Sequence, residues 1–285
     1  MKEETSVSTM QIESPANLYF LHIASEDPPR LAAFYRDQMA MQETVDGGVH
    51  LLKGGSRAAV ISSGQAGTLP CFGYAMQSVQ ALDVLRERLL KNGVAMQAYA
   101  NALYLAGAFS IDDPQGRQVA FGLPATPMAP DREPARLQHV VFQTTELEDM
   151  VRFYVDKIGF TLSDEVVDME DGKVMVVFMR TDNEHHSLAF FRGSKNEWDH
   201  QCYETNEWND IRDWGDKFAR KRIPIFFGPG RHGPGNNLFF MVNDPDGNRV
   251  ELSAEIERVA HDKPAGVWEH GEYTLNSWGR AWIRT

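Results

Sequence analysis

The 285-residue chain has 40 acidic and 28 basic side chains, which gives a net charge of −12 at neutral pH. A chain of this sign repels phosphate, so nucleic acid is excluded as an expected partner. Its two cysteines are too few for a disulfide framework or a cysteine-based zinc site. It has neither the apolar stretch of a signal peptide near the N-terminus nor an apolar run of about 18 residues, so we expect a cytoplasmic protein without a membrane partner.

The sequence repeats itself across a proline-rich segment at residues 123–136. "AAFYRDQMAM" (32–41) matches "VRFYVDKIGF" (151–160), and "DDPQG" (112–116) matches "NDPDG" (243–247). Two homologous domains of roughly 130 residues suit a chain of this length. The predicted division is a flexible tail at 1–16, a first domain at 17–124, a linker at 125–136, a second domain at 137–260 and a C-terminal tail at 261–285.

The elements of the second half follow in order from its apolar patterns. Helices are predicted at 146–159, ending at Gly159, and at 208–221, with Ile211, Trp214 and Phe218 inward. Strands are predicted at 136–144, 173–181, 186–193, 199–205, 223–230, 236–244 and 248–255. The first half follows the same order with weaker signals. The predicted fold is α+β, with tandem βαβββ modules, two per domain, and each domain an open, curved barrel of mixed sheet.

Three predicted strands of the second half each carry one metal-capable side chain among apolar residues: His139 in "LQHVVF", His200 in "WDHQCY" and Glu251 in "NRVELS". Taken singly, each has an ordinary alternative, since a lone strand histidine or glutamate is usually a core or surface residue. A buried, unpaired carboxylate costs several kcal/mol, however, and three such groups are tolerated together if they share a cation. Two histidines and one carboxylate are typical of non-haem Fe(II) oxygenases.

The first half serves as an internal comparison for these three positions. At the repeat positions of the proposed ligands we find Phe20, roughly Gly73, and Ala120, none of which binds a metal. The fold therefore does not require the polar residues, and metal is expected in the second half only. Fe(II) is the expected cation, with Mn(II) as the alternative for the same ligands. Zinc is less suited, because its structural sites are closed and usually contain thiolates.

On these residues the chain resembles the two-domain type I extradiol ring-cleavage dioxygenases of the vicinal oxygen chelate superfamily, over about residues 17–260. In that family the N-terminal domain is a metal-free relic and the C-terminal domain binds Fe(II) through His, His and Glu, which match His139, His200 and Glu251. The resemblance implies cleavage of a substituted catechol by dioxygen in the catabolism of aromatic compounds. The implied partners are a small aromatic diol and dioxygen, and a homo-oligomer is expected.

Two further histidines match the family pattern. "NEHHSLAFF" places His185 and His186 where the family has an acid/base histidine beside the dioxygen site. We favour His186, because it would share a strand face with Leu188 and Phe190, and we expect His185 to be simply exposed. "GRHG" supplies His232, which the resemblance implies as a partner of the substrate oxygen.

One position departs from the family. Many members carry a tyrosine ten residues before the metal-binding glutamate, and here that residue is Met241. A thioether donates no hydrogen bond, so substrate contact must differ. Phe190, Phe239 and Phe240 either line an apolar pocket or fill the core. We expect a bulky alkyl- or aryl-substituted catechol.

Two other functions remain open. The first is a metal-dependent lyase, isomerase or thiol transferase of the same superfamily. The second is a non-catalytic protein that binds an aromatic ligand. Dioxygen uptake with catechols distinguishes both from a dioxygenase.

Overall fold

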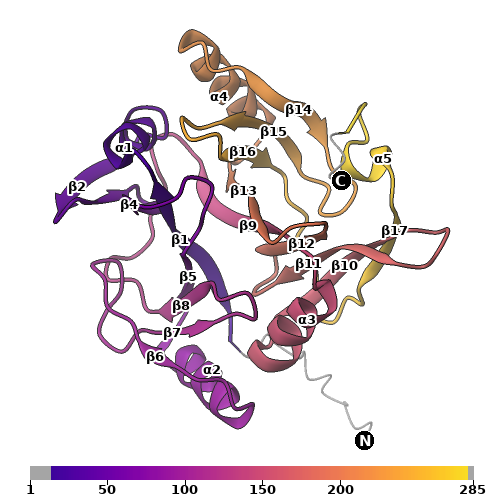
Figure 1. Cartoon of the computed structure of the whole chain (residues 1–285). Helices are drawn as coiled ribbons and strands as arrows, with labels where there is room; N and C mark the ends of the chain where they lie inside the picture. Colours follow the sequence, from indigo (N-terminus) through magenta and orange to yellow (C-terminus); the bar gives the residue numbers. More distant parts are fainter. Residues whose placement is uncertain (1–13, 282–285) are drawn as a thin grey trace, which may run out of the picture.

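The computed structural model describes residues 14–281, so most of the tail predicted at 1–16 lies outside the described residues. The chain forms two mixed open sheets of eight and nine strands, one from each half of the sequence (Figure 1). Helices pack on each sheet. This arrangement confirms the predicted α+β fold with two homologous units.

The first sheet is built from two βαβββ modules. Its strand order is β2-β3-β4-β1-β5-β8-β7-β6, with β1 and β5 side by side where the two modules meet. The elements are β1 (Ala16–Ser25), α1 (Pro28–Asp37), β2 (Gln42–Asp46), β3 (Val49–Lys53), β4 (Ala58–Ser63), β5 (Cys71–Met76), α2 (Val79–Lys91), β6 (Gln97–Ala98), β7 (Phe109–Asp112) and β8 (Gln118–Gly122).

The second sheet repeats this plan and adds one strand at its edge. Its order is β14-β15-β16-β13-β9-β12-β11-β10-β17. The elements are β9 (Arg136–Thr144), α3 (Leu147–Val151), the π-helical η1 (Arg152–Ile158), β10 (Thr161–Val167), β11 (Val174–Arg180), β12 (Leu188–Arg192), β13 (Glu197–Glu204), α4 (Trp208–Arg220), β14 (Ile225–Arg231), β15 (Leu238–Asn243), β16 (Arg249–Ala254), β17 (Gly266–Glu269) and α5 (Glu272–Leu275).

Local sequence explains the best-predicted elements of this half. In α4 the side chains of Ile211, Trp214 and Phe218 are buried at helical spacing, as predicted. The helix formed by α3 and η1 ends at Gly159, whose φ of 104° lies in the left-handed region that favours glycine. Both helices therefore begin and end within one or two residues of the predicted bounds.

The C-terminal residues pack on the second sheet. β17 pairs in parallel with β10, and α5 follows it beside the end of β14 (Figure 1). The sequence predicted neither β17 nor α5, and it also missed β10. The sequence of β10, "TLSDEVV", is too polar to give a clear strand signal.

The two halves are joined by a reciprocal pair of buried hydrogen bonds. Tyr35 of the first half donates to Asp244 Oδ2 of the second at 3.2 Å, and Tyr154 of the second half donates to Asp113 Oδ2 of the first at 3.2 Å. Both aspartates belong to the repeated Asp-Pro turns. Each repeat motif therefore contributes one hydrogen-bond partner to the packing of the two halves. The buried apolar residues of both halves form one continuous core.

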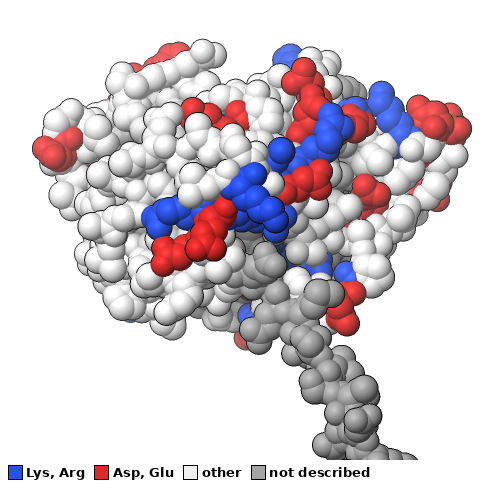
Figure 2. All heavy atoms as spheres, turned by 90° about the horizontal axis from the view of Figure 1, so that it is seen from below, with Lys and Arg blue, Asp and Glu red and all other residues white. Residues whose placement is uncertain are grey.

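The surface carries charges of both signs. On the face in Figure 2, acidic and basic side chains are interspersed along a band, and most of the remaining face is uncharged. Within residues 14–281, no helix is long and apolar enough to cross a membrane.

Candidate metal centre

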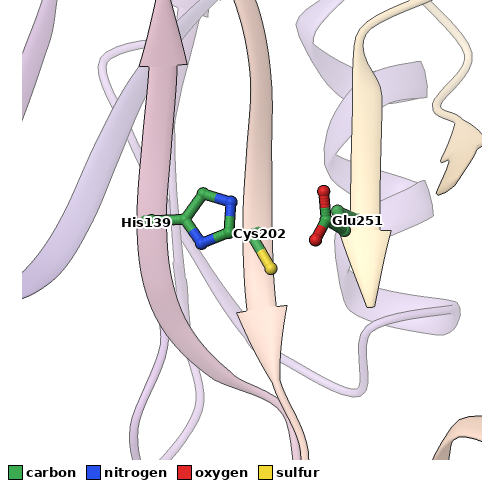
Figure 3. A group of neighbouring side chains, drawn as sticks. All are labelled: His139, Cys202 and Glu251. Atoms are coloured by element: carbon green, nitrogen blue, oxygen red, sulfur yellow. The ribbon is translucent and has the colours of Figure 1, made fainter. Parts of the chain in front are cut away.

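A row of three buried side chains crosses the second sheet. His139 on β9 pairs with Cys202 on β13, and Cys202 pairs with Glu251 on β16. Residues paired across neighbouring strands project to the same face. Their potential ligand atoms all lie within 4.8 Å of one another, and Figure 3 shows the three side chains extending into one space.

His200 completes the group. It stands two residues before Cys202 on β13, so it projects to the same face. Its Nε2 lies 3.3 Å from Glu251 Oε2, and its ring centroid lies 5.5 Å from that of His139. The structure thus brings together the three side chains that the sequence singled out, and it adds Cys202. The sequence could have indicated Cys202, because a residue two positions after His200 on the same strand projects to the same face.

The hydrogen bonds of the two histidines leave the same ring nitrogen available. Nδ1 of His139 contacts the amide oxygen of Gln138, and Nδ1 of His200 contacts a carboxylate oxygen of Asp199. Both oxygens accept hydrogen bonds, so each Nδ1 carries the proton and the lone pair of each ring lies on Nε2. This is the usual way in which a protein orients an imidazole toward a metal.

Glu251 lacks the partners that a buried carboxylate needs. It is fully buried, and its Oε2 has no hydrogen-bond donor among the described residues. Its Oε1 has a long contact of 3.4 Å from the amide of Asn237 and lies 3.8 Å from Nε2 of His232. An unsatisfied buried acceptor costs about 1–3 kcal/mol, and a divalent cation would supply the missing partner. As donor types, two imidazole nitrogens and one carboxylate suit such an ion.

The electrostatics favour nitrogen and oxygen ligands over sulfur. Burial raises the pKa of the Cys202 thiol well above its usual value, so the thiol stays protonated, and its Sγ contacts Ser253 Oγ at 3.0 Å. The thiolate, not the thiol, is the metal ligand.

The first half contains the equivalent row without metal-binding side chains. Phe20 pairs with Gly73, and Gly73 pairs with Ala120, in the same pattern as the row in Figure 3. Aromatic rings fill the space: a Cβ added to Gly73 would lie 2.0 Å from Cε1 of Phe20 and 2.5 Å from the hydroxyl of Tyr104. The first half therefore has no room for an ion at this place.

One repeat position in the sequence comparison was wrong. Gly73 is the counterpart of Cys202, not of His200, because each is the middle residue of its row. The counterpart of His200, two residues earlier, is Cys71, which is buried and free. The prediction that every counterpart is incapable of binding metal therefore fails for Cys71, although Phe20 and Ala120 are confirmed as counterparts. The two positions differ by two residues along one strand, so both side chains lie on the same face and the apolar pattern does not distinguish them.

His186 lies beside the proposed ligands. Its ring centroid is 4.5 Å from that of His139, and burial lowers its pKa well below the usual value, so the ring is neutral. The strand-face reason for choosing His186 was wrong, because it precedes β12 and does not follow that strand's alternation. Leu188 and Phe190 instead face the core. The expectation that His185 is exposed is also wrong, since its exposed fraction is 0%.

A narrow cavity with about 30 Å³ of free volume adjoins this group. Room of this size suits a water molecule, so a catechol ring requires the cavity wall to move. Apart from His139, His186, His200 and His232, the lining residues are Val141, Phe178, Phe191, Phe227, Pro234, Met241, Thr274 and Leu275.

The candidate substrate residues divide between this cavity and the core. Met241 and His232 line the cavity. Phe239 packs with Met241, whereas Phe190 and Phe240 belong to the core. His232 stacks on Phe239 with 3.8 Å between the ring centroids, and its Nδ1 donates to the carbonyl oxygen of Leu275 at 2.5 Å. Its Nε2 is therefore the nitrogen available to a ligand.

Comparisons with known proteins place the chain in a family. The model of the Glyoxalase/Bleomycin resistance protein/Dioxygenase superfamily matches residues 136–252. Metapyrocatechase 2 of Cupriavidus necator is 31% identical over 151 residues, which are 51% of this chain and 45% of that protein. The chain thus spans less than half the length of the first curated relatives that it matches.

Other relatives are covered more completely. Biphenyl-2,3-diol 1,2-dioxygenase 3 of Rhodococcus globerulus is 31% identical over 50% of this chain and 75% of its own. An iron-dependent extradiol dioxygenase of Rhodococcus jostii is 31% identical over half of each chain. The solved structure of homoprotocatechuate 2,3-dioxygenase from Arthrobacter globiformis superposes with a TM-score of 0.80 at 21% identity, covering 99% of this chain and 93% of that one, which establishes the shared fold.

The sequence identity to a largely covered relative, the two-sheet fold and the buried His, His and Glu all agree. The chain belongs to the extradiol dioxygenase family of the glyoxalase/bleomycin resistance protein/dioxygenase superfamily.

Proposed function

We propose that this protein cleaves the ring of a substituted catechol next to its two hydroxyl groups, using dioxygen and a divalent metal ion held by His139, His200 and Glu251. Fe(II) is the proposed ion, and Mn(II) fits the same ligands. The observation that carries the proposal is the fully buried Glu251 carboxylate, whose Oε2 has no donor among the described residues and which faces His200 Nε2 at 3.3 Å.

When bound, the ion would bring the diol and dioxygen together and allow electrons to pass between them. The protein would supply three ligands, His139, His200 and Glu251, and the remaining coordination positions of such an ion would be open to substrates. Nδ1 of His139 donates to Gln138 and Nδ1 of His200 donates to Asp199, which makes Nε2 of each ring the nitrogen that would bind the ion. These outer contacts fix the orientation of each ring and raise its basicity.

The remaining histidines are proposed to handle protons and to orient the substrate. The reaction adds both atoms of dioxygen to a catechol and breaks one ring carbon–carbon bond, giving an unsaturated hydroxy acid with a carbonyl group. The hydroxyl protons of the catechol must move during this conversion. The neutral ring of His186 lines the cavity and would take and return a proton there. His232 would contact a substrate oxygen through Nε2.

The proposed substrate carries an apolar substituent. Val141, Phe178, Phe191 and Phe227 contribute apolar groups to the cavity wall, and Met241 occupies the position of the family's tyrosine. Among residues 14–281, no arginine or lysine lines the cavity. A carboxylated catechol would leave its charge unpaired in such a site, at a cost of several kcal/mol. An alkyl or aryl substituent would instead gain apolar contact.

The same proposal assigns different roles to the two halves of the chain. The metal-binding catalytic unit comprises residues 137–260, and the unit at 17–124 binds no metal, because Phe20, Gly73 and Tyr104 fill the equivalent space. We further propose a cytoplasmic homo-oligomer, a location that suits its two free, buried cysteines.

Anaerobic reconstitution with Fe(II), followed by an oxygen-electrode screen of catechols, tests the proposal. We expect dioxygen uptake with 3- or 4-alkylcatechols or 2,3-dihydroxybiphenyl. A lyase, isomerase or thiol transferase would consume no dioxygen, and a binding protein would hold the catechol without turnover. Either result from a fully loaded protein would overturn the proposal.

A further inference from the structure

A chain of three buried side chains leads away from the cavity, and the proposed mechanism uses only the last of them. Nε2 of His185 lies 2.9 Å from Asp164 Oδ2, and Nδ1 of His185 lies 2.9 Å from Nδ1 of His186. Asp164, His185 and His186 have exposed fractions of 4%, 0% and 3%. A buried aspartate, this far from water, needs several donors to remain ionised.

Asp164 has those donors. The backbone N–H of Gly266 donates to its Oδ1 at 3.0 Å, and the indole N–H of Trp268 donates to its Oδ2 at 2.6 Å. Both residues belong to β17, the strand that pairs with β10. Burial raises the pKa of Asp164, but His185, Trp268 and Gly266 together hold that pKa below its ordinary value. Asp164 is therefore a carboxylate and can only accept hydrogen bonds.

The direction of each hydrogen bond follows from this carboxylate. Nε2 of His185 lies 2.9 Å from the Asp164 carboxylate but outside hydrogen-bond alignment. The negative charge of the carboxylate favours a proton on this nitrogen over a bare lone pair. With that single proton on the ring, Nδ1 of His185 is bare and can only accept. Nδ1 of His186 must donate to it, and Nε2 of His186 is left with a lone pair.

From this geometry we infer that Asp164 and His185 are positioning residues that fix the tautomer of His186, so that its Nε2 meets the substrate as a proton acceptor. The inference rests on the proposed function and deepens it. The proton-transfer role proposed for His186 requires a bare Nε2, and the hydrogen bond from its Nδ1 to His185 keeps that nitrogen bare. A carboxylate that orients a catalytic histidine through its far nitrogen acts in the same way in serine proteases.

Three substitutions separate this role from a merely structural one. In His185→Gln, the amide can donate to Asp164 and accept from His186, so the direction of the chain is preserved. His185→Phe removes both contacts. In Asp164→Asn, an amide group facing His185 would reverse the direction, with Nε2 of His186 protonated. His50→Phe is the matched control, because His50 is a buried histidine paired with Glu43 at 2.6 Å in the first half.

The first readout is the protonation of the imidazole nitrogens, measured by ¹⁵N NMR on metal-free protein labelled at histidine. We expect His186 to be protonated at Nδ1 in the parent, in His185→Gln and in His50→Phe. We expect protonation at Nε2, or a mixture, in His185→Phe and Asp164→Asn. An Nε2-protonated His186 in the parent, or a His185 protonated at both nitrogens, would overturn the inference.

The second readout is turnover after reconstitution with Fe(II). We expect His185→Phe to lower kcat about 10–100-fold, as is usual for the loss of an orienting partner, with Mn(II) binding and KM unchanged. His185→Gln should stay within a few-fold of the parent. Equal losses in the Gln and Phe variants would contradict a positioning role. If His185→Phe does not fold, Asp164→Asn and His185→Gln still provide the comparison.

The two proposals can fail separately. If no catechol supports dioxygen uptake while His186 is protonated at Nδ1 as expected, the proposed reaction is wrong and the tautomer assignment stands. If uptake is observed and the tautomer is reversed, the reaction stands and the positioning role is wrong.

Discussion

The substitution Glu251→Gln isolates the charge of the proposed metal ligand while keeping its shape. In the metal-free parent, the Glu251 carboxylate is fully buried, its Oε2 has no donor among the described residues, and His200 Nε2 faces that oxygen at 3.3 Å. An unsatisfied buried acceptor of this kind costs about 1–3 kcal/mol. The amide of glutamine is neutral and can donate to that imidazole nitrogen. We therefore expect the metal-free variant to be more stable than the parent by about 1–3 kcal/mol, which is several degrees in Tm.

Added metal should reverse this ranking. A ligand at 100 times its Kd stabilises the folded state by about 2.7 kcal/mol. We expect this gain in the parent with Mn(II), an air-stable probe, and no gain in Glu251→Gln. Urea unfolding with and without Mn(II), together with metal analysis, measures both effects. Glu255→Gln, which changes a more exposed carboxylate four residues later, should behave like the parent. The reasoning is refuted if the metal-free Glu251→Gln protein is less stable than the parent, or if Mn(II) still stabilises it.

The remaining predictions concern proton transfer, substrate choice and a second buried carboxylate. His186→Phe should bind Mn(II) like the parent and lose about 10²–10⁴-fold in kcat; a loss of less than tenfold in an oxygen-electrode assay would exclude the acid/base role. Met241→Tyr should alter the ranking of kcat/KM among catechol, alkylcatechols, 2,3-dihydroxybiphenyl and homoprotocatechuate without loss of metal, and an unchanged ranking would mean that residue 241 does not contact the substrate. Burial raises the pKa of Glu204 from 4.5 to about 7, so its contribution to stability is present below pH 4.5 and is lost as the pH rises through 7. Glu204→Gln should accordingly gain about 2–3 kcal/mol relative to the parent between pH 5 and pH 8 in urea unfolding of the metal-free protein, and a difference independent of pH would contradict the raised pKa.

Much of the second half was predictable from local pattern. The predicted range 136–144 is the observed β9, and α4 has its three predicted inward residues, because valine-rich runs and helical spacing report directly on burial. His139, His200 and Glu251 stood out because each is a polar group within such a run. Strand alternation predicts that each of these side chains points to one face of its sheet, and comparison with the first half, which lacks them, marks the same three positions.

The features that the sequence did not predict depend on tertiary contacts. Asp164 lies in the polar strand β10, and its importance comes from His185 and from Trp268, which is 104 residues away in sequence. Nothing local distinguishes such an aspartate from a surface residue. Cys202 joins the metal row through pairing with β9 and β16, which requires the strand register. The register also corrected the counterpart of His200 from Gly73 to Cys71, since a two-residue slip leaves the hydrophobic pattern unchanged.

Ring cleavage with ¹⁸O₂ is the most direct test of the central claim. The protein, reconstituted anaerobically with Fe(II), is mixed with an alkylcatechol or 2,3-dihydroxybiphenyl under ¹⁸O₂, and the product is analysed at once by mass spectrometry. The account predicts a ring-opened acid that contains two ¹⁸O atoms from dioxygen, and no product from Glu251→Gln. Absence of labelled product from a protein shown to hold one Fe(II) per chain, or equal labelling by Glu251→Gln, would contradict it.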